Sequence, residues 1–365
     1  MIFLKKPLII LTGPTAVGKT KLSISLAQAV NGAIISADSM QVYRHMDIGS
    51  AKIRPEEMCG VPHYLINVLD PSEEFHVVKF VELAHEAMEK IYAAGQIPIV
   101  TGGTGFYIQA LLKEVDFTES HGELPIRKQL EEKAATEEGA AELYRELSEV
   151  DPASAETIHP NNVKRVIRAL EYYHETGQKI SEHNEEQKQK ESPYCSAYFV
   201  LNDERSILYD RIDRRVDQMI CDGLVDEVFR LKEMGYTRDL VSMQGLGYKE
   251  LFPYLAGECT LEEAVYIIKR DTRHFAKRQL TWFRREKDVI WLNKPDFDYD
   301  EEKILIIYAG SLERNRLRPM QRKKENNHVD RKKLAMYSTL GISKEVFAFG
   351  TKIEEELKER FAKIE

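Results

Sequence analysis

The apolar positions in the first 120 residues follow two different periodicities. Continuous apolar runs, which are typical of strands buried on both faces, occur at three places: 8–12, 33–36 and 97–101. Between these runs, residues 21–30 and 77–94 have apolar side chains at helical spacing, and Gly95 is expected to cap the second helix. Strands that alternate with helices predict right-handed crossovers and a parallel sheet covered by helices.

The strand pattern is absent from about residue 124 to residue 191. Apolar spacing there predicts three helices: 125–138, 140–150 and 161–176. The polar stretch at 182–191 is expected to be a loop or an exposed helix end. We therefore expect an all-helical insertion at 121–195.

The strand pattern returns at 197–201 and 289–292. The residues between these strands predict four helices: 205–221, 226–234, 249–256 and 261–284. The expected α/β core is therefore discontinuous and consists of 1–120 and 196–310. Beyond it the composition becomes basic without apolar periodicity, which indicates an extension at 311–365 of unknown role with a terminal helix at 343–364.

Composition limits the classes of protein that fit this pattern. The chain has 365 residues and 43% hydrophobic content, which suits about two domains with buried cores. Its formal net charge of −8 excludes a general attraction to nucleic acid, so RNA binding would need a local basic patch. The four cysteines form no CxxC pair, which argues against a zinc ribbon and suits reduced thiols in a cytoplasmic protein. No run of about 18 apolar residues occurs, so no membrane span is expected.

A phosphate-binding loop follows the first predicted strand. The motif G-x-x-x-x-G-K-[ST] is formed by Gly13, Pro14, Thr15, Ala16, Val17, Gly18, Lys19 and Thr20. Its backbone N–H groups and the following helix N-terminus favour phosphate oxygens, Lys19 reaches the terminal phosphate, and the Thr20 hydroxyl suits Mg²⁺. The motif indicates an oligophosphate site without saying that the phosphate belongs to ATP.

One acid stands where a second functional group is expected. P-loop kinases and ATPases usually have an acid at the end of an apolar strand, yet the run at 97–101 ends in threonine and glycines. Only Asp38, after the run at 33–36, is so placed. It could bind a metal, act as a base on a nucleophile, or cap a turn.

Several segments together resemble the tRNA dimethylallyltransferases, also called tRNA isopentenyltransferases. The resembling segments keep the order of that family and span about residues 7–292: 13–20, 38–43, 49–52, 62–65, 102–107, 247–250 and 277–284. The resemblance implies a P-loop NTPase-like core that transfers a dimethylallyl group from dimethylallyl diphosphate to tRNA. The acceptor would be N6 of the adenine immediately 3′ of the anticodon, giving N6-(dimethylallyl)adenosine.

The resemblance also implies roles for individual residues. Asp38 would be the general base, while Thr15, Lys19 and Arg215 would act on the diphosphate. Mg²⁺ would bind at Thr20. In this family the loop holds the diphosphate of the prenyl donor rather than ATP.

The expected tRNA contacts fall in both the core and the insertion. By motif position they are Asp38, Ser39, Met40, Gln41, Thr104, Arg127, Lys164, Arg165 and Arg168. A further basic stripe is expected at 264–287, where Lys and Arg recur at helical spacing, with interleaved aromatics that we expect to be core. The partner that the resemblance implies is the anticodon stem-loop, and we expect a monomer.

Three other functions remain open from the residues alone. A P-loop kinase for a small metabolite or nucleotide explains the loop at 13–20 but not the segment at 38–43. A prenyltransferase acting on free AMP or ATP shares the loop and the acid, although a mononucleotide would not need the basic insertion. A non-catalytic RNA-binding module would have no use for an intact phosphate loop.

Overall fold

The computed structural model describes residues 5–115, 125–300 and 304, and the chain divides into two compact units. The α/β unit comprises the described residues of Met1–Leu111 and Tyr194–Glu365, and the helical unit is Leu112–Pro193. The extension expected at 311–365, with its terminal helix, lies outside the described residues.

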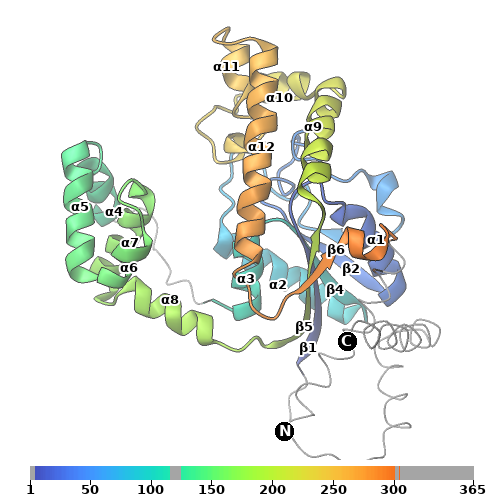
Figure 1. The fold of residues 1–365 in the computed structure, drawn as a ribbon, viewed down its shortest axis with the longest axis horizontal. Helices are drawn as coiled ribbons and strands as arrows, with labels where there is room; N and C mark the ends of the chain where they lie inside the picture. The colour runs from blue at the N-terminus through green and yellow to red at the C-terminus, as the bar shows by residue number, and fades with distance from the viewer. Residues whose placement is uncertain (1–4, 116–124, 301–303, 305–365) are drawn as a thin grey trace, which may run out of the picture. The chain divides into compact units, whose positions relative to one another are not determined.

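One parallel sheet of six strands forms the centre of the α/β unit (Figure 1). Its strands, in spatial order, are β3 (His63–Tyr64), β2 (Gly32–Ala37), β4 (Ile97–Gly102), β1 (Lys6–Thr12), β5 (Tyr194–Asn202) and β6 (Ile290–Asn293). The short β3 was not predicted, because two residues carry no periodic signal. The other strands lie where the apolar runs placed them, and all pairs are parallel as expected.

Three neighbouring strands end beside one another at the same edge of the sheet. Ala37 at the end of β2 and Thr12 at the end of β1 both pair with Gly102 at the end of β4. The phosphate loop, Asp38 and the Gly103–Thr104 turn therefore leave the sheet together. In open parallel sheets this carboxyl edge is where ligands bind.

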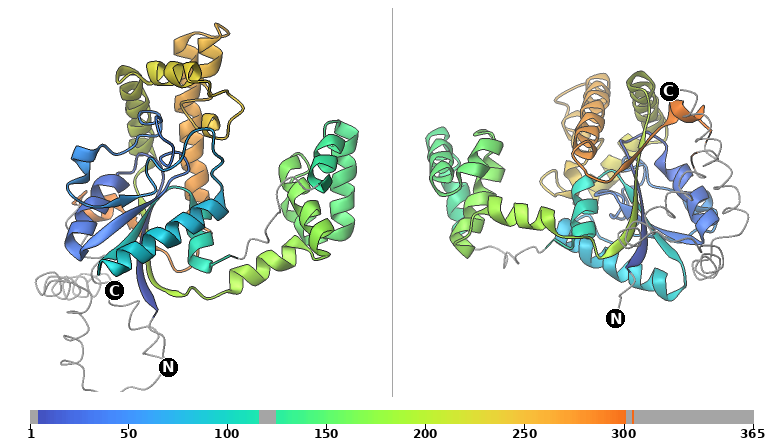
Figure 2. Two further views of the ribbon diagram at one scale, coloured as in Figure 1. Left: turned by 180° about the vertical axis from the view of Figure 1, so that it is seen from behind. Right: turned by 60° about the horizontal axis from the view of Figure 1, so that its bottom comes forward.

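Helices surround this sheet in the α/β unit (Figure 1). They are α1 (Lys19–Val30), α2 (Val77–Ala93), α3 (Gly105–Lys113, whose last turn enters the helical unit), α9 (Arg205–Cys221), α10 (Leu224–Glu233), α11 (Leu251–Leu255) and α12 (Leu261–Phe283), with short 3₁₀ turns η1 (Pro55–Met58), η2 (Ser242–Gln244) and η3 (Lys294–Phe297). Figure 1 shows α9, α10, α11 and α12 grouped beyond the carboxyl ends of the strands, and Figure 2 shows α9 and α12 side by side. These helices can therefore contribute side chains to a site at that edge.

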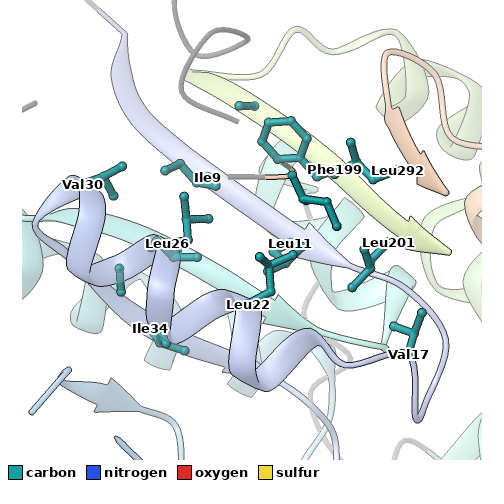
Figure 3. Packing of buried hydrophobic residues seen from close by; sticks show 14 of the residues in the cluster. Ile9, Leu11, Val17, Leu22, Leu26, Val30, Ile34, Phe199, Leu201 and Leu292 are labelled. Carbon is teal, nitrogen blue, oxygen red and sulfur yellow. The ribbon is translucent and has the colours of Figure 1, made fainter. Parts of the chain in front are cut away.

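The core between α1 and the sheet follows from the alternation of strand side chains. Leu22 and Leu26 of α1 face Ile9 and Leu11 of β1, with Ile34 of β2 beside them (Figure 3). All five side chains are essentially inaccessible to water. Since this packing fixes both the strand before the phosphate loop and the helix after it, the loop has rigid supports at each end.

The opposite face of the sheet is also covered. Ile10 and Ile35 point away from α1 by strand alternation, yet both are buried. The amphipathic α2 contacts β2 and β4 and buries an apolar stripe that includes Phe80, Ala84 and Met88. Burial on both faces explains why the strands read as continuous apolar runs.

Five helices lie wholly within the described residues of the helical unit. They are α4 (Pro125–Lys133), α5 (Glu137–Val150), α6 (Pro152–Thr157), α7 (Val163–Thr176) and α8 (Ile180–Gln189). Its core is formed mainly by α5 and α7, with Leu143, Leu147 and Leu170 fully buried. The unit spans Leu112–Pro193, whereas we expected an insertion at 121–195. It begins earlier than expected because the last turn of α3 belongs to it.

Two helices of this unit were not predicted, and one buried acid explains both. Asp151 caps α6 by accepting hydrogen bonds from the backbone N–H and the hydroxyl of Ser154 (3.1 and 2.6 Å). It also accepts from the backbone N–H and hydroxyl of Ser181, in the first turn of α8 (3.0 and 2.6 Å). The polar stretch that we expected to be a loop or helix end is therefore held as a helix by a residue thirty positions away.

Candidate active site

The phosphate loop is held in a conformation that its glycines require. Gly13 has a φ of 149°, and a Cβ there would lie 2.3 Å from the carbonyl oxygen of Leu201. Gly18 has a φ of 96°, directly before α1 begins at Lys19. The loop therefore turns its backbone toward the N-terminus of α1, as anion binding requires.

Lys19 folds back over this loop. Its ammonium donates hydrogen bonds to the carbonyl oxygens of Gly13 (3.0 Å) and Pro14 (2.8 Å). Burial lowers the pKa of Lys19 to about 8; the negative charge of Asp38 opposes this shift and the positive charge of Arg215 adds to it. These three charged groups thus share one poorly hydrated space, where a bound anion would stabilise the charged lysine.

Asp38 follows β2 and is half-buried. Its Oδ1 accepts hydrogen bonds from the backbone N–H groups of Met40 (2.8 Å) and Gln41 (3.4 Å). Within the described parts of the chain, no hydrogen bond is formed by its Oδ2. Asp38 therefore caps a turn with one oxygen and keeps the other for a ligand, so the turn-capping and chemical interpretations are compatible.

The three neighbouring arginines of α9 have different surroundings. Arg215 lines the site, and its burial lowers its pKa against the opposing charge of Asp38. Arg211 also lines the site but is paired with Asp203, while Arg214 is 82% exposed and lies 3.5 Å from Asp210. Arg215 is therefore the arginine of this group best placed to bind an anion.

Two cavities adjoin at these residues. The first, of about 330 Å³, is lined by the phosphate loop, and the second, of about 440 Å³, by α9, α12 and the loop at 244–247. The residues that line both cavities are Thr15, Ala16, Asp38, Ser50, Arg215, Phe275 and Gln279. The arrangement can therefore hold an anion in one cavity and a second molecule in the other, with a carboxylate and an arginine between them.

Gln279 joins the two walls of this site and was not singled out from the sequence. Its Oε1 accepts a hydrogen bond from the backbone N–H of Thr15 (2.8 Å), and its Nε2 donates to the carbonyl oxygen of Gly103 (3.0 Å). The only signal for it was its position within the resembling segment 277–284. The Thr15 N–H is therefore already occupied by Gln279, so Thr15 would interact with a ligand through its hydroxyl.

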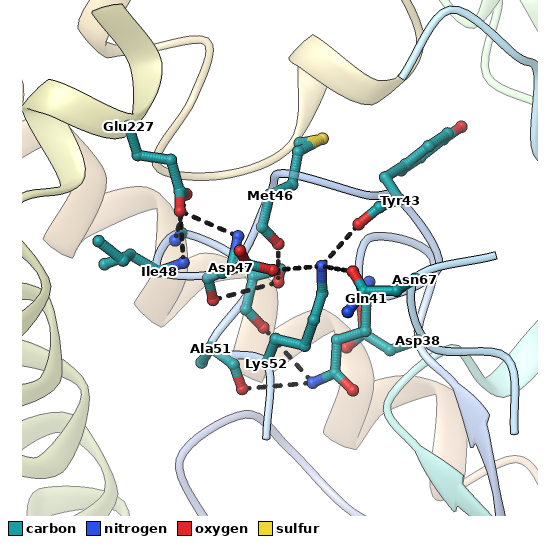
Figure 4. A network of polar contacts seen from close by, with 12 residues as sticks. Asp38, Gln41, Tyr43, Met46, Asp47, Ile48, Ala51, Lys52, Asn67 and Glu227 are labelled. Atoms are coloured by element: carbon teal, nitrogen blue, oxygen red, sulfur yellow. Dashed lines mark hydrogen bonds and ion pairs between the residues drawn. The ribbon is translucent and has the colours of Figure 1, made fainter. Parts of the chain in front are cut away.

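The residues expected to contact tRNA separate into two groups. Ser39, Met40 and Thr104 line the second cavity together with Asp38. Gln41 lines the first cavity instead, and its amide is engaged because its Oε1 accepts from the Ser36 hydroxyl. Its Nε2 donates to the Ser50 and Ala51 carbonyl oxygens (Figure 4).

The other expected tRNA contacts belong to the helical unit. Arg127 and Arg168 both pair with Glu171, at 3.6 and 2.9 Å, and the Glu171 side chain is only 2% exposed. Lys164 and Arg165 are exposed at the start of α7. The four basic residues therefore differ, since two neutralise a buried acid and two face solvent.

Part of the basic stripe expected at 264–287 is engaged in ion pairs within the protein, while its Lys277 and Arg284 are exposed. Lys269 pairs with Asp217 (2.6 Å), and Arg273 makes two hydrogen bonds to Asp213 (2.5 and 2.8 Å), so both side chains turn toward α9. Their charges are neutralised within the protein, because the two acids of α9 have the same spacing along their helix as Lys269 and Arg273 have along α12. We expected the aromatic residues interleaved in this segment to belong to the core, and one of them, Phe283, is completely buried.

The structure offers few protein ligands for the Mg²⁺ that we expected at Thr20. Thr20 lines the first cavity beside Lys19. Among residues 5–115, 125–300 and 304, no group of three or more His, Cys, Asp or Glu could hold a metal ion. A metal here would therefore depend largely on the oxygens of a bound phosphate.

Among residues 5–115, 125–300 and 304, no helix has the length and apolar character needed to cross a membrane.

Comparison with known proteins identifies the family. The IPP transferase family model matches residues 41–286, and the isopentenyl transferase model matches residues 6–72. The chain is 66% identical to the tRNA dimethylallyltransferase of Lachnoclostridium phytofermentans, over 81% of this chain and 94% of that protein. It is 50% identical to the same-named protein of Acetivibrio thermocellus, over 81% and 94%.

A solved structure agrees with this assignment. The tRNA isopentenylpyrophosphate transferase of Bacillus halodurans superposes with a TM-score of 0.64 and 46% identity, covering 86% of this chain and 98% of that one. The resemblance seen in the sequence and the P-loop NTPase-like fold it implied are therefore confirmed. The chain belongs to the tRNA dimethylallyltransferases, a family of prenyl transferases that modify tRNA.

Proposed function

We propose that this protein transfers the dimethylallyl group of dimethylallyl diphosphate to N6 of the adenine immediately 3′ of the anticodon in tRNA. The observation that carries the proposal is the pair of adjoining cavities with Thr15, Asp38 and Arg215 in both linings. A diphosphate in the first cavity and an adenine in the second would meet at these three side chains. The product is N6-(dimethylallyl)adenosine.

The first cavity suits the diphosphate of the donor. The loop amides, the N-terminus of α1, the Lys19 ammonium and the Arg215 guanidinium all offer positive potential to phosphate oxygens. As the allylic C–O bond breaks, negative charge grows on the leaving oxygen, and these fixed groups stabilise it. The Thr15 hydroxyl adds a further donor, since its backbone N–H is bound to Gln279.

Asp38 is the base in this proposal. The exocyclic amine of adenine is a poor nucleophile because its lone pair is delocalised into the ring. The Oδ2 of Asp38 accepts a hydrogen bond from that amine, and it takes the proton as nitrogen bonds to the allylic carbon. The two N–H bonds to Oδ1 hold the carboxylate in place during this step.

The donor oxygens around Thr20 fit Mg²⁺, which prefers oxygen ligands and often binds through substrate phosphates. Thr20 would hold the ion together with the diphosphate, and its charge would offset that of the leaving group. Lys19 and Arg215 supply the positive charge that this chain itself contributes.

The helical unit supports a role in gripping tRNA. Lys164 and Arg165 are exposed cations suited to RNA phosphates, whereas Arg127 and Arg168 already pair with Glu171. The target adenine must be swung out of the anticodon loop to reach Asp38. A monomeric state and a cytoplasmic location remain predictions.

A direct test incubates the protein with unmodified tRNA, labelled dimethylallyl diphosphate and Mg²⁺. We expect label in the nucleoside next to the anticodon and none when free AMP replaces tRNA. Labelled AMP would favour the mononucleotide prenyltransferase. Greater thermal stabilisation by ATP with Mg²⁺ than by dimethylallyl diphosphate would favour the kinase.

A further inference from the structure

Two resembling segments, 49–52 and 247–250, have no role in the mechanism above, yet they meet in the structure. A Cβ on Gly49 would come within 2.5 Å of the Tyr248 ring, and a Cβ on Gly247 would lie 3.9 Å from the Gly49 Cα. Both segments line the second cavity. They therefore form one continuous wall of the space that we assign to the adenine.

Glu227 of α10 binds this wall from behind. One carboxylate oxygen accepts the backbone N–H groups of Asp47 (2.9 Å) and Ile48 (2.8 Å). The other accepts the N–H of Gly49 (3.1 Å) and the hydroxyl of Tyr248 (2.8 Å). Figure 4 shows Glu227 against the backbone of Asp47 and Ile48. Glu227 is only 3% exposed, so four donors satisfy a charge that water does not reach.

The effect of Glu227 extends to both cavities through backbone contacts. The Tyr248 hydroxyl accepts the Ser50 N–H (3.2 Å), and the Ser50 carbonyl oxygen in turn accepts from Gln41 (3.4 Å). Burial and the neighbouring Glu227 charge raise the pKa of Tyr248 well above its usual value, so its hydroxyl stays protonated and donates. Ser50 lines both cavities, whereas Glu227 lines neither.

We infer that Glu227 is a positioning residue for the acceptor, which holds the 47–51 loop so that the wall of the second cavity keeps its shape beside Asp38. Glu227 lines neither cavity, and among the described residues its hydrogen bonds go to the three backbone N–H groups and Tyr248. The inference rests on the proposed function, because that function puts the adenine in the second cavity. It gives a role to both unexplained segments at once.

Glu227→Gln tests this inference with little change in side-chain volume. The amide NH₂ replaces one acceptor oxygen by a donor, which then faces groups that are themselves donors. We expect kcat/KM for tRNA to fall about tenfold or more, since displacements of about 1 Å can cost about 10²-fold. The Kd of dimethylallyl diphosphate should change much less than kcat/KM, because the hydrogen bonds of Glu227 go to the 47–49 backbone and Tyr248 and not to the phosphate loop.

Two further variants frame this result. Glu233→Gln makes the same chemical change at an exposed position of α10 and should leave all constants unchanged. Tyr248→Phe removes one of the four donors and should give a smaller loss than Glu227→Gln. If Glu227→Gln does not fold, Tyr248→Phe decides, and a wild-type kcat/KM for it would overturn the inference.

Hydrogen exchange separates this inference from the proposed function. The amides of Asp47, Ile48 and Gly49 should exchange faster in Glu227→Gln than in Glu233→Gln. An active protein whose Glu227→Gln variant keeps its kcat/KM, or loses donor affinity as much as tRNA turnover, would overturn the positioning role. Wild-type protein that leaves tRNA unmodified would instead refute the proposed function.

Discussion

The two compact units use charge in opposite ways. In the α/β unit, Lys19 and Arg215 are half-buried near Asp38, and loss of hydration lowers the pKa of both cations. In the helical unit, Lys164 and Arg165 face water. A charge kept from water interacts strongly with a ligand, whereas an exposed one is screened by salt. The first arrangement suits chemistry at one atom, and the second suits a grip on an extended polyanion.

Removing the base should have the largest effect. Asp38→Ala is expected to lower turnover on tRNA by about 10²–10⁴-fold, which is the usual contribution of a general base. Donor binding should be nearly intact, because the proposed diphosphate contacts lie on the loop and α9. Single-turnover kinetics with donor binding measured by calorimetry would check both statements. Turnover equal to that of the wild type would remove Asp38 from the mechanism.

Removing either Lys19 or Arg215, the two half-buried cations, should have the next largest effect. Lys19→Ala and Arg215→Ala are each expected to weaken diphosphate binding and to slow the chemical step by about 10²–10³-fold, since both charges act on the leaving group. Arg214→Ala is the matched control, because Arg214 is a neighbour of Arg215 that is 82% exposed. Normal binding of inorganic diphosphate to the first two variants would show that the site is misassigned.

Donor affinity should depend on pH through Lys19. Burial lowers its pKa to about 8, and the diphosphate binds the charged form, so affinity is full below that pH and falls as pH rises through it. The decline should approach roughly tenfold per pH unit. Calorimetry from about pH 7 to about pH 9.5 would measure it. Lys19→Arg should remove the decline, since a guanidinium stays charged; an unchanged decline would assign it to another group.

The exposed cations should have the smallest effect, one that depends on salt. Removing Lys164 and Arg165 together should raise the KM for tRNA and lower the slope of log K against log salt by roughly 0.7–0.9 per lost phosphate contact. Arg145→Ala, an exposed cation on α5, is the control. A loss of donor affinity, or an unchanged salt slope, would contradict a role in binding RNA.

Arg168→Ala should mainly lower the stability of the fold, because it leaves the buried Glu171 with fewer partners.

Local patterns were enough to predict the centre of this molecule. The phosphate loop is a strand, a turn and a helix in direct succession, so its sequence specifies its geometry. Asp38 was found for the same reason, since it follows a buried strand whose carboxyl end must lie at the ligand edge. The sheet could be predicted because both of its faces are buried and its strands are therefore uniformly apolar.

Contacts between distant residues could not be predicted. Gln279 binds the Thr15 N–H across 264 positions, and Glu227 reaches the loop at 47–49 across about 180. The periodicity of apolar residues in a sequence does not indicate which distant polar residues will form hydrogen bonds. The basic stripe of α12 shows the same limit, because helical spacing placed Arg273 on one face without revealing that Asp213 of α9 lies opposite.

The folded-back lysine also affects how the site empties after reaction. When inorganic diphosphate leaves, the ammonium of Lys19 can return to the carbonyl oxygens of Gly13 and Pro14, which hold it in the free protein. A poorly hydrated cation without such acceptors would be destabilised each time the product departed. In the proposed reaction, the loop would thus offer the ammonium two acceptors in place of the departed product, which would favour product release.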